Sequence, residues 1–510
     1  MNAKEFLNNV SKEIKYKPAN KSITEELEAH IEDLKNDNLC KGYTDKQAEE
    51  KAVEQMGNAK KIGKKLNEIH RPKLDWITLF FSLAFIYFGG QFWSFSYLES
   101  YWNNGNNLSD WYVYYRLVCI ELIVGLIFSI FLFFYDYRKI CKHSKTLFIL
   151  ATILNVIAYL KGFRANGNLV YGLWPFTSTS PAVFTVPLYI IAFAGFIKDI
   201  EEESKISIDT SYKKTFNYNI VKIIVLSCLA VISSLMINFV SGFCVAMVYL
   251  IILTSGLLKS KQIKKTFMII LATSLGFVLL STIICIVPTR VMHRRDKYTS
   301  AYWVGVDTVG ERRIDFVRKE IFKAAKLLGQ ADLEGISLSD EQGYHSNIQN
   351  WFGTRGKFAF LGILSEYGWI ASFGLILIVI AFDIKLILSA RKITDSYGKL
   401  IVNGIISLFI VQTICNLAMN FGLIGTAEFQ LPLISGGKAT FIANLLCVVL
   451  FLSVYRRKDI NFEEPKKSKL ASKIEDFFFQ EVEENEEGVE AINAYKWYIM
   501  VIKELYNIST

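Results

Sequence analysis

The segment at residues 429–441, FQLPLISGGKATF, places a proline, a serine, two adjacent glycines and a lysine between two long apolar runs. Its GGKAT portion is similar to a phosphate-binding loop, in which backbone amides and a lysine hold a nucleotide phosphate. That motif requires glycine at position 432 and serine or threonine at position 439, where this chain has Pro432 and Ala439. No strand pattern precedes the segment either, so we reject a nucleotide site here.

Lys438 is the ionisable residue of this segment, and an ammonium group binds phosphate as a point charge. Ionisable groups at or near membrane depth are functional candidates. The alternatives are a lysine whose long side chain simply reaches water and an ion pair with Glu428. Non-helical backbone at such a depth is stable only where protein buries it or water lines it. We therefore expect a re-entrant loop, in which Pro432 ends one segment and Gly436 and Gly437 permit a tight backbone.

The elements that must position this loop are membrane spans. The chain has 510 residues, of which 52% are hydrophobic and 14% aromatic, and the apolar residues come in blocks. About 20 apolar residues cross the roughly 30 Å of hydrocarbon in a bilayer. We predict an all-α, polytopic membrane protein of about ten transmembrane helices, two of them short. The predicted spans are 75–97, 113–135, 146–161, 182–198, 219–237, 240–258, 266–288, 358–386, 400–424 and 439–455.

The charge of the connectors orients these spans. Basic connectors at 138–145, 259–265, 391–399 and 456–458 alternate with connectors that carry almost no lysine or arginine. By the positive-inside rule, the basic connectors and both termini are cytoplasmic. The formal net charge of +9 therefore reflects topology, and we predict no nucleic-acid partner.

Three regions lie outside or between the spans. Residues 1–72 predict a cytoplasmic helical domain, with a capping box at 22–25 and a second helix start at 44–47. Residues 289–357 form one large extracytoplasmic loop, which contains no cysteine and so indicates no disulfide framework. Residues 459–510 predict a charged cytoplasmic tail.

Within the large loop, residues 312–329 form an amphipathic pattern with a basic face. Such a helix can lie in the membrane interface and attract anionic headgroups. Alternatively it packs on the bundle and leaves its basic face in water. The sequence alone leaves both readings open.

The five histidines are scattered without the spacing of metal ligands, so we predict no metal site. No cofactor is identified; a divalent cation would suit pyrophosphate chemistry, but no residue pattern supports one.

The N-terminal stretch EELEAHIEDLKNDNLCKGYTDKQAEEKAVEQMGNAKKIGKKL resembles the HAAS-type prefix domains found ahead of membrane proteins in Gram-positive bacteria. The resemblance implies an interaction or regulatory module with a cytoplasmic partner.

The stretch NLAMNFGLIGTAEFQLPLIS resembles, without gaps, the last-loop signature of the SEDS family, the FtsW/RodA/SpoVE-type membrane proteins of cell division, cell shape and sporulation. The resemblance extends over residues 73–458, with ten spans and a large outer loop between the seventh and eighth. The residues shared with the signature are Asn416, Met419, Gly422, Leu423, Leu431, Pro432, Ile434, Ser435 and Gly437.

This resemblance implies a protein of peptidoglycan synthesis in the bacterial plasma membrane. Family members polymerise lipid II, the undecaprenyl-pyrophosphate-linked disaccharide, usually beside a transpeptidase penicillin-binding protein. It also implies a site for lipid II or another undecaprenyl-linked precursor. Its candidate residues here are Lys357, Glu366, Asn416, Ser435, Gly437 and Lys438.

The chain departs from the family at ionisable positions. The family's acid opens an Asp-Phe-x-Phe motif that a Glu-Glu pair and a glycine follow. Here KFAFLGILSEYG has Lys357 in place of the acid and Ser365 in place of the first glutamate, while Glu366 remains. In the fourth span, Val183 and Val186 replace the family's ionisable pair.

Glycosyl transfer benefits from a carboxylate that accepts the hydroxyl proton or holds a metal at the pyrophosphate. A protonated Lys357 does neither, although it can bind the leaving pyrophosphate. Glu366 is the remaining family carboxylate and our candidate catalytic residue; the alternative is a structural role. Carboxylates of the large loop could substitute in space, namely those of Asp307, Asp315, Asp332 and Asp340.

Three hypotheses follow: an active lipid II polymerase with a rearranged site, a SEDS-like scaffold or regulator of wall assembly without polymerase activity, and a transporter of lipid-linked precursors. We place the transporter last, because the spans lack an obvious set of buried charges for coupling and no internal repeat is evident.

Overall fold

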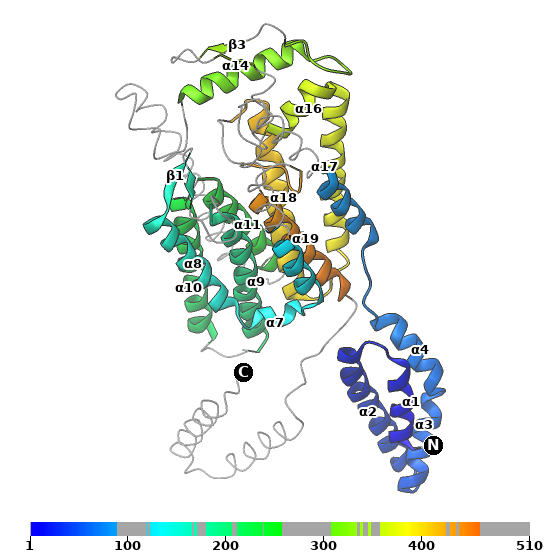
Figure 1. Ribbon diagram of the computed structural model, residues 1–510. Helices are drawn as coiled ribbons and strands as arrows, with labels where there is room; N and C mark the ends of the chain where they lie inside the picture. The colour runs from blue at the N-terminus through cyan, green and yellow to red at the C-terminus, as the bar shows by residue number, and fades with distance from the viewer. Residues whose placement is uncertain are drawn as a thin grey trace. The chain divides into compact units, whose positions relative to one another are not determined.

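The computed structural model describes residues 2–88, 120, 123–165, 168–170, 180–206, 212–237, 239–257, 308–333, 337–339, 345–347, 358–424, 429–434 and 438–458. The chain divides into two compact units, whose described parts are residues 2–71 and residues 72–458 (Figure 1). We call them the prefix unit and the membrane unit.

The prefix unit consists of four helices: α1 (Ala3–Glu13), α2 (Lys17–Cys40), α3 (Asp45–Met56) and α4 (Ala59–His70). Side chains cap two of them, since Asn2 accepts from the Glu5 amide and Asn58 from the Lys61 amide. The predicted helix start at 44–47 is confirmed, since α3 begins at Asp45 and Thr44 and Gln47 form a capping box there. Buried side chains from all four helices form its own core, including Phe6, Ile31, Val53 and Ala59.

One predicted helix start in this unit is wrong. The capping pattern at residues 22–25 suggested a start there, but α2 begins five residues earlier, at Lys17. Pro18 lies in its first turn, where a proline loses no hydrogen bond and its fixed φ suits the helix.

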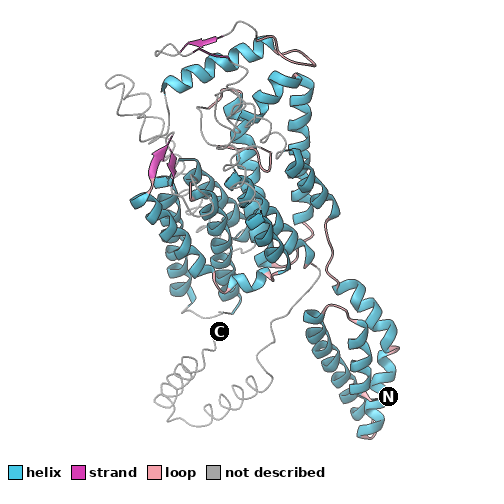
Figure 2. Ribbon diagram, viewed as in Figure 1, coloured by secondary structure: helices cyan, strands magenta, loops and turns pink. Residues whose placement is uncertain are grey.

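The membrane unit is a helical bundle, which confirms the predicted fold class (Figure 2). Five of its described helices are long and apolar enough to cross a membrane, and four more apolar helices are shorter. The long ones are α8 (Ser144–Lys161), the Ala182–Glu201 part of α9 (Ala182–Ile206), α17 (Trp369–Ala390), α18 (Ser396–Asn420) and α19 (Lys438–Arg456). The shorter ones are Trp76–Phe88, Ile123–Phe134, and the apolar parts of α10 (Tyr212–Ile237) and α11 (Phe239–Leu257).

These helices overlap nine of the ten predicted spans. The remaining predicted span, 266–288, lies outside the described residues. Two short antiparallel hairpins accompany the helices, β1 (Phe163–Ala165) with β2 (Asn168–Val170), and β3 (Ser337–Ser339) with β4 (His345–Asn347).

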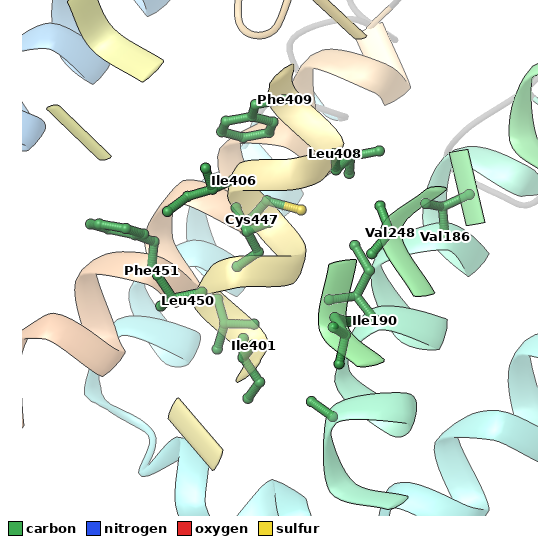
Figure 3. Close-up of a cluster of buried hydrophobic side chains, with 14 of the residues drawn as sticks. Val186, Ile190, Val248, Ile401, Ile406, Leu408, Phe409, Cys447, Leu450 and Phe451 are labelled. Atoms are coloured by element: carbon green, nitrogen blue, oxygen red, sulfur yellow. The ribbon is translucent and has the colours of Figure 1, made fainter. Parts of the chain in front are cut away.

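The core of the membrane unit lies where α9, α11, α18 and α19 meet. Figure 3 shows apolar side chains from these four helices gathered in one cluster, among them Ile190, Val248, Ile401 and Phe451. Small residues allow close approach, as usual between membrane helices. A Cβ added at Gly404 would lie 2.5 Å from a methyl carbon of Ile190, so the glycine lets α18 approach α9.

Charged and polar side chains hold together the end of the bundle at which the short helix α7 (Tyr137–Cys141) lies; we call it the α7 end. The Tyr137 hydroxyl donates to Asp395, 2.9 Å away, and Asp395 caps the N-terminus of α18. Arg457 is buried and donates to the carbonyls of Phe134 and Ser453, at 2.7 and 3.1 Å. Burial raises the pKa of Tyr137, so its hydroxyl stays protonated as a donor.

A second polar contact joins the first membrane helix to α17. Lys385 lies 3.1 Å from a carboxylate oxygen of Asp75, and Ser389 donates to the same oxygen at 2.5 Å. Asp75 also accepts from the Thr78 amide and so caps the helix Trp76–Phe88.

Candidate functional site

The candidate site lies at the other end of the bundle, where α14 (Thr308–Ala324) and α16 (Ala359–Tyr367) cover the end of α18 (Figure 1). We call it the α14–α16 end. The predicted span 358–386 is not one helix here: α16 ends at Tyr367, and α17 begins at Trp369. Gly368 separates them with φ +86°, a left-handed conformation that glycine adopts without strain.

Backbone hydrogen bonds attach the chain after α14 to this break. The amides of Trp369 and Ile370 donate to the carbonyls of Lys326 and Leu327, at 3.0 and 3.1 Å. These bonds satisfy amides that have no partner within a helix N-terminus. The amide of Ala331 donates in turn to the carbonyl of Ser365, 2.8 Å away. The predicted helix 312–329 accordingly ends at Ala324, because the following backbone pairs with the break.

The apolar stripe of α14 packs on the bundle. Its buried side chains Ile314, Val317 and Ile321 share a cluster with α16 and α18. The partners in that cluster are Phe358, Phe360, Leu361, Leu364 and Met419. Of the two alternatives that the sequence left open, the structure shows packing on the bundle: the apolar stripe is buried there. Lys319, Lys323 and Lys326, on the basic face, are exposed.

Arg318 is an exception on the basic helix α14, because its side chain is only 9% exposed. One terminal nitrogen lies 2.9 Å from Asp315, and its Nε has no hydrogen-bond partner among the described residues. The guanidinium fills the space beside Gly422, where an added Cβ would lie 2.0 Å from it. Gly422 has φ +77°, so the first turn of the signature loop favours glycine for its conformation.

The signature segment after α18 leaves helical conformation and turns back into protein. Phe429, Leu431, Leu433 and Ile434 are buried in the main core. The predicted buried, non-helical segment is therefore confirmed for residues 429–434. Asn416 of α18, fully buried, donates to the carbonyl of Phe429 at 2.7 Å and fixes this segment against the helix.

Residues 431–434 form a β-turn closed by a 3.3 Å hydrogen bond from the Ile434 amide to the Leu431 carbonyl. Pro432 occupies its second position, and Leu433 its third with φ +62°. This is the pattern of a type II turn, whose third position normally belongs to glycine. A bulky residue in this conformation costs about 1–2 kcal/mol, a cost that burial of the leucine side chain offsets.

Aromatic rings join the two segments that resemble family motifs. Phe360 of α16 lies 5.0 Å, centroid to centroid, from Phe421 at the end of α18. Phe322 of α14 lies 6.0 Å from Phe421 and 5.6 Å from Trp369. The fold thus brings residues 358–369 and 416–422, far apart in the sequence, to one place beside α14.

The predicted site residues fall into three groups. Asn416 is buried and bonded to the signature segment, and Glu366 is exposed near the C-terminus of α16. Lys438 is the first residue of α19. Lys357, Ser435 and Gly437 lie outside the described residues.

The loop aspartates that could replace the family acid are described only in part. Asp315 pairs with Arg318, and Asp332 is exposed. Asp307 and Asp340 lie outside the described residues. No group of three or more His, Cys, Asp or Glu side chains in the described part of the chain is arranged to hold a metal ion.

Neutral polar side chains surround the positions at which the family's fourth-span ionisable pair is missing. Val186 is buried, and the neighbouring Thr185 donates to Asn155 at 3.0 Å. One turn further along α9, the Tyr189 hydroxyl lies 2.8 Å from Ser233. These bonds join α8, α9 and α10 without any charge.

Sequence reasoning missed Arg318 and the break at Gly368. The periodicity of α14 grouped Arg318 with its charged face, whereas the structure buries its side chain beside Gly422. The Tyr-Gly pair at 367–368 could have indicated a helix end, since glycine often follows a helix C-terminus.

The geometry defines a class: a polytopic helical membrane protein in which the non-helical residues 429–434 are buried in the bundle and an amphipathic helix covers the end of α18. Residues 345–460 match the FtsW/RodA/SpoVE family of cell cycle proteins. A 128-residue stretch is 28% identical to the probable peptidoglycan glycosyltransferase FtsW of Thioalkalivibrio sp. (strain K90mix), over 22% of this chain and 32% of that relative. The match thus spans about a third of the relative's length.

Solved structures resemble the fold over a longer range. A chain from a peptidoglycan synthase complex that coordinates polymerization and crosslinking superposes with a TM-score of 0.50 at 17% identity, over 76% of this chain and 98% of that one. The rod shape determining protein RodA of Thermus thermophilus gives a TM-score of 0.49 at 15% identity, over 76% and 97%. Over residues 345–460 the chain is therefore similar in sequence to the FtsW/RodA/SpoVE family, and over a longer range its fold is similar to that of the peptidoglycan synthase chain.

Proposed function

We propose that this protein acts in peptidoglycan synthesis at the bacterial plasma membrane and binds lipid II, or another undecaprenyl-linked precursor, at the α14–α16 end. One observation supports the proposal: the two motif segments meet there through the Phe360–Phe421 contact, while the Asn416–Phe429 hydrogen bond holds the signature segment against α18. In this proposal the α14–α16 end faces outward and both termini are cytoplasmic.

The proposed substrate-binding residues are those that the family resemblance marks. Lys357 and Lys438 would supply positive charge to the pyrophosphate, and an ammonium group needs no fixed geometry for that. Asn416 would act indirectly, because its amide already holds the Phe429 carbonyl and so sets the path of the loop. The remaining proposed residues are Glu366, Ser435 and Gly437.

We further propose that the protein binds the precursor without polymerising it and serves as a scaffold or regulator beside a penicillin-binding transpeptidase. Three ionisable family positions have changed to Lys357, Val183 and Val186. At a fourth ionisable family position, Ser365 replaces the first glutamate of the pair. Ser365 is buried, and its hydroxyl donates to the Gly362 carbonyl of its own helix. A relative found in a complex that couples polymerization to crosslinking supports a transpeptidase partner.

The second candidate is an active polymerase in which Glu366 takes the proton. Its exposed carboxylate near the end of α16, on a segment that reaches the signature loop, supports this candidate. We propose that binding of the precursor needs no cofactor. We also propose that the prefix unit binds a cytoplasmic partner.

Fluorescent lipid II and purified full-length protein separate the two candidates. We expect no glycan polymer from the unmodified chain. The double variant Lys357→Asp with Ser365→Glu restores two carboxylates at the family positions, and polymer from it alone would show that their loss silenced the site. Polymer from the unmodified chain that Glu366→Gln abolishes would overturn the non-polymerising proposal in favour of the second candidate.

A further inference from the structure

The charges of the prefix unit are separated between its helices. α4 carries four lysines and one glutamate, whereas α2 carries six acidic residues and three lysines, and α3 four acidic residues and two lysines. α4 packs against α1, and α2 packs against α3. Helix α1 has two lysines and two glutamates, so a neutral helix lies next to the basic one.

The lysines of α4 share one exposed face. The opposite side of the helix packs on α1, where a Cβ added at Gly63 would lie 2.9 Å from the Val10 carbonyl oxygen. Ile69, at the C-terminal end, is 53% exposed and adds an apolar group next to this face. We call the exposed side chains Lys60, Lys61, Lys64 and Lys65 the lysine face.

No carboxylate in the described residues forms an ion pair with the lysine face, whereas on the acidic side Lys35 binds Asp45 at 2.8 Å and Lys21 lies 3.8 Å from Glu25. That bond to Asp45 raises the pKa of Lys35. Two lysines near the acidic side thus form ion pairs with neighbouring carboxylates, whereas the lysine face forms none in the described residues.

The chain holds the end of α4 close to the membrane unit. α4 ends at His70, and three residues later the Lys73 amide donates to the carbonyl of Arg456 at the end of α19, 3.1 Å away. Three extended residues reach about 10 Å at most. The apolar helix Trp76–Phe88 follows three residues after Lys73. The C-terminal end of α4 is therefore only a few residues of chain away from the first apolar helix.

We propose that the lysine face of α4 binds anionic phospholipid headgroups at the surface from which the first membrane helix starts. Basic residues next to a membrane span are attracted to an anionic surface within a Debye length, about 8 Å at physiological salt. An exposed isoleucine beside them adds apolar contact with the interface. The acidic helices α2 and α3 are repelled by the same surface and so remain available to a cytoplasmic partner. This inference does not rest on lipid II binding.

The test uses full-length protein in nanodiscs of phosphatidylcholine, or of an equal mixture of phosphatidylcholine and phosphatidylglycerol. Lysines are acetylated briefly and the modification of each is measured by mass spectrometry. Lys21 on α2, with a side chain that is 86% exposed, is the internal control. We expect acetylation of the lysine face to fall at least about threefold in the anionic discs, to recover at high salt, and to leave Lys21 unchanged.

Equal acetylation of the lysine face in both lipids would overturn the proposal, and so would an equal fall at Lys21. Protection that persists at high salt would also overturn it, because it would indicate docking on protein.

A pair of charge-matched variants gives a second readout by hydrogen exchange of the α4 backbone in anionic discs. Replacing the four lysines of the lysine face by glutamine should remove the lipid-dependent protection. The same change at Lys21, Lys41, Lys46 and Lys51, all exposed on α2 and α3 or between them, should preserve it. Loss in the second variant alone, or in neither, would contradict the proposal.

Discussion

The two ends of the membrane unit are held together by different kinds of interaction. At the α7 end, buried Arg457 and the Tyr137–Asp395 bond join helix ends through charge and hydrogen bonds. At the α14–α16 end, an apolar stripe, stacked rings and backbone hydrogen bonds at Gly368 do this work. The α7 end therefore depends on buried charge and side-chain hydrogen bonds, whereas the α14–α16 end depends on apolar packing and backbone hydrogen bonds.

The largest effect is expected from a substitution that disrupts the backbone junction at Gly368, at the α14–α16 end. Gly368→Ala should lower the free energy of unfolding by about 3 kcal/mol, because the new Cβ meets the Lys326 carbonyl oxygen at 2.6 Å in a left-handed conformation. SDS titration in mixed micelles measures this quantity. The control is Gly374→Ala in α17, where an added Cβ meets nothing within 4 Å. Equal effects of the two substitutions would show that the junction carries no strain on substitution.

A slightly smaller loss of stability is expected when the buried charge at the α7 end is removed. Arg457→Met keeps most of the volume but leaves the carbonyls of Phe134 and Ser453 without their donor, at an expected cost of about 2–3 kcal/mol. Lys392→Met, at an exposed position near the same end, should cost less than about 0.5 kcal/mol. If Arg457→Met unfolds no more easily than the control, the contrast between the two ends fails.

The signature loop allows a comparison of two buried asparagines. Asn416→Leu should destabilise by about 2 kcal/mol, because the buried Phe429 carbonyl loses its donor. Asn444 of α19 is also buried, but its amide nitrogen has no partner among the described residues. Asn444→Leu should be neutral or stabilising in the same titration. The opposite order would mean that Asn416 does not hold the loop.

The smallest effect concerns the exposed face of α14. Lys323 lies 2.8 Å from Glu320, but its side chain is 72% exposed. An exposed pair of this kind contributes less than about 0.5 kcal/mol. Lys323→Gln should leave the thermal midpoint within experimental error. A large fall would show that the basic face, and not the apolar stripe, holds α14 in place.

Sequence reasoning located the helices better than their junctions. Hydrophobic runs predicted the bundle, and Pro432 with its neighbours predicted a buried loop, because both follow from the cost of unpaired backbone in an apolar medium. The break at Gly368 was not predicted, because the run from 358 to 386 stays apolar across it. The backbone groups that bond to the break come from residues 326–331, which the run does not include. The burial of Arg318 was not predicted for the same reason, because its side chain lies beside Gly422, which is distant in sequence.

Binding of the lipid precursor tests the central claim most directly. Full-length protein in nanodiscs is titrated with fluorescent lipid II, and the unmodified chain is compared with Lys438→Ala at the start of α19 and with Lys392→Ala near the α7 end. The account predicts saturable binding that Lys438→Ala weakens about tenfold, equivalent to roughly 1.4 kcal/mol, and that Lys392→Ala leaves unchanged. Absence of binding by the unmodified chain, or equal binding by all three, would contradict it.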